Sequence, residues 1–168
     1  MMSNTPAKHQ LLIACMLAQR DLANSLLAVY PNMINQFDAE DQQLMAKACW
    51  ETHNQTEIVR LMLDCGFPVG IPEYNHGYQP LHNAAWCGNS EVVQLLVSHG
   101  HPIDELDPVY QASAAQWCII SATQVRCYPD VDYGGVIKAL IEAGMEGLTK
   151  LYPTGHSAID AILVEARN

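Results

Sequence analysis

The chain has 168 residues, which is enough for one domain with a sizeable hydrophobic core. Hydrophobic residues make up 49% of it and charged residues only 15%, so the composition excludes a largely disordered protein. The net charge of -10 argues against nucleic acid and anionic membranes as partners, since both need a basic surface, and favours a basic or apolar protein surface instead.

We expect neither an export signal nor a membrane span at the N-terminal end. Its apolar run at residues 11–18 is far shorter than the roughly 20 residues that cross a bilayer, and no convincing cleavage site follows. The cysteines form no C-x-x-C pair, so we expect reduced thiols in a cytoplasmic protein. They are Cys15, Cys49, Cys65, Cys87, Cys118 and Cys127.

Apolar residues recur in helix-like pairs along the chain, with a period of about 34 residues. In chain order the expected helical segments are residues 11–15 and 21–27, 44–48 and 57–66, the two halves of 77–100, 110–118 and 135–144, and a last one at 155–161. Gly66 and Gly100 end equivalent helices 34 residues apart. This spacing predicts a stack of similar units.

The third segment shows its helix boundaries most clearly. Pro80 suits the first turn of a helix, where its missing N–H costs nothing. Gly88 can take the left-handed conformation that ends this helix, and Asn89 or Ser90 can cap the next one. Gly100 then predicts the end of the second helix.

These residues read G-Y-Q-P-L-H-N-A-A-W-C-G-N-S-E-V-V-Q-L-L-V-S-H-G, and they resemble an ankyrin repeat, whose pattern is G-x-T-P-L-H-x-A-A-x-x-G-H-x-E-V-V-x-L-L-L-x-x-G. Gln79 stands where the family has Thr, and Asn89 where it has His. In the family, that Thr and the following His tie neighbouring turns together by hydrogen bonds. The resemblance therefore implies an altered network around His82.

The resemblance implies an all-α fold, an ankyrin-repeat solenoid of stacked antiparallel helix pairs with projecting β-turn or hairpin tips. We expect a single domain over residues 1–168, in a small stand-alone protein of a bacterial type that is a monomer. The expected repeats are residues 8–37, 38–72, 73–106, 107–147 and a partial capping repeat at 148–168. Extra residues are expected between the helices of the second repeat, and an inserted loop from Ser121 to Tyr133 in the fourth.

In this family the turn tips and the short first helices form a concave binding surface, which here is rich in aromatic residues. Aromatic side chains supply much of the energy of interfaces. For Trp50 and Trp117, covering the loops between helices is an equally good interpretation. The candidate partner-binding residues are Asn75, His76, Tyr78, Trp86, Cys87, Trp50, Cys49, Tyr110 and Trp117.

Acidic residues also lie at or near the expected turn tips. They either steer a basic partner by long-range attraction or only solvate the tips. These residues are Asp38, Glu40, Asp41, Glu73, Asp104, Glu105 and Asp107.

No sequence motif for catalysis, for a metal or for another cofactor is present. The favoured function is a non-catalytic protein-interaction module that presents a rigid concave groove and turn tips to a partner protein. One alternative is a small Cys/His-dependent enzyme or metal-binding protein, centred on the segment between His76 and Cys87. Another is a structural subunit that works inside a larger assembly through its end repeats.

Overall fold

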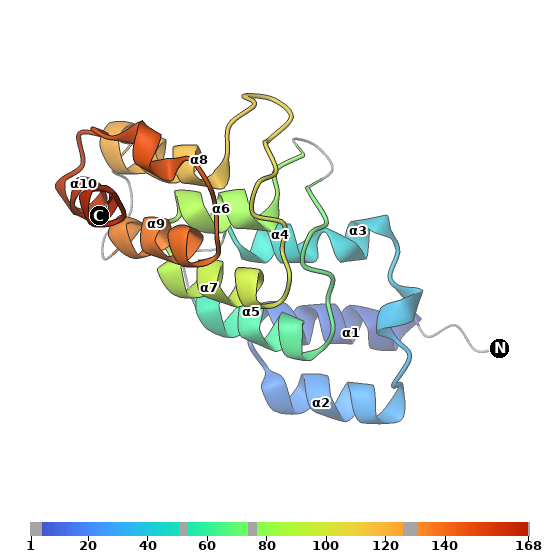
Figure 1. Ribbon diagram of the computed structural model, residues 1–168. Helices are drawn as coiled ribbons and strands as arrows, with labels where there is room; N and C mark the ends of the chain where they lie inside the picture. Colours follow the sequence, from blue (N-terminus) through green and yellow to red (C-terminus); the bar gives the residue numbers. More distant parts are fainter. Residues whose placement is uncertain (1–4, 51–53, 74–76, 126–130, 168) are drawn as a thin grey trace.

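A computed structural model describes residues 5–50, 54–73, 77–125 and 131–167. Figure 1 shows an elongated pile of helices in which each pair packs on the next, from α1 and α2 at the N-terminal end to α10 at the C-terminal end. The first helices α4, α6 and α8 form one layer, and the second helices α5, α7 and α9 form the other. The elements are α1 (Thr5–Met16), α2 (Arg20–Val29), η1 (Ile34–Gln36), α3 (Ala39–Gln42), α4 (Leu44–Ala48), α5 (Gln55–Asp64), α6 (Pro80–Trp86), α7 (Ser90–Ser98), α8 (Ala114–Ile120), η2 (Ser121–Val125), α9 (Tyr133–Glu142), η3 (Leu148–Leu151) and α10 (Ser157–Glu165).

The expected all-α solenoid is confirmed. Within the described ranges no strand forms, and the one β-type pairing is an isolated bridge between Leu106 and Ser113 at the tip before α8. The Asp107 N–H donates to the Ala112 carbonyl at 3.0 Å and closes this tip. None of the helices seen in these ranges is long and apolar enough to cross a bilayer.

The boundary signals in the third segment act as the sequence predicts. Pro80 is the first residue of α6, and Gly88 ends that helix with a φ of 66°. Gly88 also lies where the next unit packs, because an added Cβ would come within 2.8 Å of the Val131 Cβ. Asn89 is the residue that caps α7: its Oδ1 accepts the Val92 N–H at 3.1 Å. The lack of a side chain at Gly88 and the cap made by Asn89 therefore mark the end of α6 and the start of α7.

One hydrophobic core runs through the pile from Leu11 in α1 to Leu163 in α10. A single helix pair could not bury its apolar face, so each pair is stabilised by the next. The polar link that the family makes between turns is present only in part. His82 is buried and its Nε2–H donates to the Ala112 carbonyl at 3.1 Å, but its Nδ1 and the Oε1 of Gln79 are both buried without a hydrogen-bond partner among the described residues.

Two expectations about loops are corrected. The acidic stretch at Asp38 is not an open turn tip: it forms the short helix α3, where Asp38 and Asp41 make a capping box and both pair with Lys8. The inserted loop does not begin at Ser121, because Ser121–Val125 continues α8 as a π-helical turn. The Ser121 hydroxyl lies 2.9 Å from the Tyr133 hydroxyl in the buried interior, which fixes this turn against α9.

Candidate functional site

Five aromatic side chains meet on the face made by the first helices and the turn tips. We call them the aromatic cluster: Trp50, Tyr78, Trp86, Tyr110 and Trp117. The ring centroids of Trp50 and Trp86 are 6.3 Å apart and nearly parallel. Trp117 is the centre of the cluster, at 5.5 Å from Trp86, 4.7 Å from Tyr78 and 6.3 Å from Tyr110. The cluster joins residues that the sequence places in three successive expected repeats.

A buried carboxylate fixes the centre of this cluster. The indole N–H of Trp117 donates to Asp107 Oδ2 at 2.9 Å. The Ala112 N–H donates to the same oxygen at 3.0 Å, and the N–H groups of Val109 and Tyr110 donate to Oδ1 at 3.0 and 2.7 Å. Asp107 has no exposed surface, so the turn tip and α8 are held together by one residue.

Asp107 is therefore not one of the acidic residues that solvate or steer at the tips. Burial alone raises the pKa of its carboxyl, but the hydrogen bonds from Tyr110, Trp117, Ala112 and Val109 together outweigh it and lower the pKa below its usual value. The result is an ionised carboxylate in the interior. The sequence contains a weak signal for it, since Asp followed by Pro often accepts the N–H groups of its own turn.

The exposed ends of the aromatic cluster lie on either side of this buried centre. Tyr110 is 68% exposed and Trp50 is 42% exposed, while Tyr78 and Trp86 are half-buried. Trp117 is only 6% exposed, so it supports the surface and offers little contact area of its own.

Two of the predicted partner-binding residues lie in the core. Cys49 is completely buried and Cys87 almost so, because both face the neighbouring helix pair. Burial raises the pKa of the Cys49 thiol, so it stays protonated. Neither cysteine offers contact area to a partner. Asn75 and His76 lie outside the described residues.

From residue 77 to Cys87, the described part of the segment proposed for a Cys/His site, the histidine and cysteine side chains are committed to structural contacts. Burial lowers the pKa of His82, and its Nε2–H is committed to the Ala112 carbonyl. His101 is also buried, accepts the Leu81 N–H and donates from Nδ1 to the Pro102 carbonyl. Within the described ranges no three His, Cys, Asp or Glu side chains are placed to share a metal ion.

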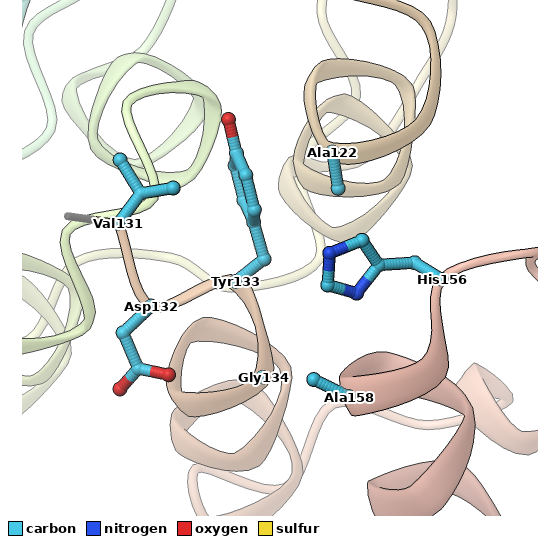
Figure 2. A pocket seen from close by; sticks show the side chains of 7 residues that line it. All are labelled: Ala122, Val131, Asp132, Tyr133, Gly134, His156 and Ala158. Carbon is cyan, nitrogen blue, oxygen red and sulfur yellow. The ribbon is translucent and has the colours of Figure 1, made fainter. Parts of the chain in front are cut away.

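A cleft of about 320 Å³ lies between the ends of α8, α9 and α10 (Figure 2). The His156 ring packs against Tyr133 with 5.9 Å between ring centroids, and the rest of the wall is formed by Ala122, Val131, Asp132, Gly134 and Ala158. The Asp132 carboxylate points away from His156, since it caps α9 at the Gly135 N–H and accepts the Ser90 hydroxyl. Among the described residues that line this cleft, the polar side chains do not converge on a common point.

Comparison with known proteins agrees with the stacked helix pairs. A family model of ankyrin repeats in three copies matches residues 11–107. A glycerophosphocholine phosphodiesterase, gde1 of Schizosaccharomyces pombe, is 26% identical over 118 residues, which are 70% of this chain and 10% of that protein. A 2-5A-dependent ribonuclease of Homo sapiens is 34% identical over 61 residues, which are 36% of this chain and 8% of the ribonuclease. The chain thus spans at most about a tenth of the length of these curated relatives.

Proposed function

The chain belongs to the ankyrin-repeat family, whose repeats bind other proteins, and we propose that it is a non-catalytic interaction module that holds a partner protein on the aromatic cluster. The observation that carries the proposal is the cluster itself: two exposed aromatic rings at the ends of a surface whose centre is fixed by Asp107 and Trp117.

Rigidity and aromatic area both favour binding at this surface. Four hydrogen bonds to Asp107 order the tip that carries Tyr110 before any partner arrives. Binding then costs less conformational entropy than it would on a disordered loop. Large aromatic side chains that lose exposed area on association are the residues that most often dominate the binding energy.

The enzyme names of the two relatives do not transfer to this chain. It matches no more than a tenth of either relative's length, and the family model accounts for residues 11–107. We propose that the module is a monomer and that it lies in the cytoplasm. The cysteines support the cytoplasmic location. The five cysteines in the described part of the chain are buried thiols outside any disulfide, which is typical of a reducing compartment.

Capture from a lysate of the source cell tests the proposal. The double variant Trp50→Ala/Tyr110→Ala removes the two exposed ends of the cluster, and we expect it to lose at least tenfold in capture of the partner because interface aromatics carry most of the energy. The matched control is Ile13→Ala/Leu17→Ala, since these residues are 57% and 61% exposed and belong to the first expected repeat.

Both variants should unfold within a few degrees of the wild type, because exposed side chains contribute little to stability. Equal capture by the Trp50→Ala/Tyr110→Ala variant and the wild type would refute the proposal. So would loss of capture in the Ile13→Ala/Leu17→Ala control alone.

A further inference from the structure

Three acidic residues lie at the Tyr110 end of the aromatic cluster or next to its neighbour Tyr78. Asp107 lies directly beneath the tip, and the Glu73 N–H donates to the Tyr78 carbonyl at 3.0 Å. Burial, with the neighbouring Tyr110, Asp107 and Glu73, raises the pKa of the Tyr78 hydroxyl, so these two acidic groups lie near it. Glu105 accepts a hydrogen bond from the side chain of Gln79, which follows Tyr78 in the sequence.

None of these three carboxylates belongs to an ion pair among the described residues. N–H dipoles stabilise Asp107, but no cation neutralises its charge. The acidic residues that do form ion pairs lie elsewhere: Asp38, Asp41, Asp64, Glu57, Glu91 and Glu142. As far as residues 5–50, 54–73, 77–125 and 131–167 are concerned, the Tyr110 end therefore combines an exposed aromatic ring with negative charge that no ion pair compensates.

This combination suits a planar cation better than a compact one. A guanidinium group stacks on an aromatic face, donates several N–H bonds to carboxylates in a fixed geometry and is more weakly hydrated than an ammonium group. Asp107 adds only its charge, because both of its oxygens already accept two N–H groups each. Glu73 and Glu105 remain able to accept new bonds.

We propose that the partner is a basic segment whose arginine side chain stacks on the Tyr110 ring, at the end of the cluster where Glu73 and Glu105 lie beside Tyr78 and Gln79, while an apolar side chain of the same segment packs at the Trp50 end. The proposal rests on the proposed function and names the chemistry of its partner.

The chain has three tryptophans and all of them belong to the cluster, so its tryptophan fluorescence reports on this surface directly. The probe is a capped peptide that repeats Gly-Arg-Leu, titrated at low ionic strength. One matched peptide carries citrulline, a neutral group of the same shape, in place of each arginine, and another carries lysine. We expect saturable binding of the arginine peptide, about tenfold tighter than that of the citrulline peptide.

Variants assign this preference to the Tyr110 end. Tyr110→Ala and Glu73→Gln should each reduce the ratio of arginine to citrulline affinity, whereas Trp50→Ala should weaken both peptides by the same factor. Glu142→Gln, which neutralises an exposed carboxylate on α9, is the matched control and should leave the ratio unchanged. Thermal unfolding of each variant shows that it is folded.

The inference is overturned if the arginine peptide gives no saturable change, or if the citrulline or lysine peptide binds as tightly. Its failure can be told apart from failure of the proposed function. If lysate capture depends on Trp50 and Tyr110 but the peptides do not discriminate, only the arginine inference fails. If capture is insensitive to both residues, the interaction surface itself is misplaced.

Discussion

The Asp107 carboxylate organises both the turn tip and the centre of the aromatic cluster. Three of its partners are backbone N–H groups within five residues, and the fourth is an indole ten residues downstream. Charge-assisted hydrogen bonds of this kind are stronger than neutral ones, and they hold the exposed Tyr110 in place.

Asp107→Asn tests this role. In asparagine an NH₂ group replaces one of the two carboxylate oxygens. An NH₂ group cannot accept hydrogen bonds from the N–H groups that this oxygen accepts in the wild type, so at least one donor loses its partner in a buried site. We expect the free energy of unfolding at neutral pH to fall by about 3 kcal/mol in chemical denaturation. Asp104→Asn, at an exposed position in the same tip, is the control and should change it by less than about 0.5 kcal/mol. Equal stability of the two variants would contradict the role.

The direction of the pKa shift of Asp107 determines how its contribution to the free energy of unfolding changes with pH. Because the pKa of Asp107 is lower in the folded chain than in the unfolded one, its stabilisation is fully present above the unfolded value of about 3.9 and is lost as the pH falls through the folded value. The difference in unfolding free energy between the wild type and Asp107→Asn should therefore shrink on acidification below about pH 4. A constant difference down to pH 2 would argue against an ionised Asp107.

At the scale of the element, the start of α6 is an incomplete version of the family's turn. Gln79 is the N-cap residue of α6, but its side chain accepts no hydrogen bond from the helix N-terminus. It reaches Glu105 instead, and in the part of the chain that the structure describes its own Oε1 and the Nδ1 of His82 are buried without partners. Unpaired buried acceptors cost stability, so this helix start is weaker than it could be.

Gln79→Thr should stabilise the chain for this reason. A threonine hydroxyl at the N-cap can accept an N–H of the first turn and donate to His82 Nδ1, as the resemblance to the family implies. We expect a gain of about 1 kcal/mol, which raises the midpoint of thermal unfolding by roughly 2–4 °C. Gln79→Ala removes the same side chain without supplying a cap and should not stabilise. A melting temperature of Gln79→Thr at or below that of Gln79→Ala would contradict this account.

At the scale of the whole molecule, the helices that recur in each unit could be predicted from the sequence, and the elements that depart from the repeat could not. Residues 44–48 were expected as a helix and form α4 (Leu44–Ala48), because apolar spacing and small residues recur at the same positions in each unit. The short helix α3 and the π-helical turn η2 were missed, since each occurs once and has no counterpart in the neighbouring units.

The candidate surface was predictable in its location but not in its construction. The aromatic residues could be assigned to one face from the family pattern alone. The burial of Asp107, Cys49 and Trp117 could not, because it depends on contacts between side chains of different repeats and on backbone N–H groups that only a folded tip brings together.

The most direct test of the central claim is hydrogen–deuterium exchange of the chain with and without its captured partner. If the partner lies across the turn tips and first helices, exchange should slow at residues 77–79 and 106–113 while α5, α7 and α9 are unaffected. Slower exchange confined to α5, α7 and α9, with both tips unchanged, would place the partner on the opposite layer and contradict the account.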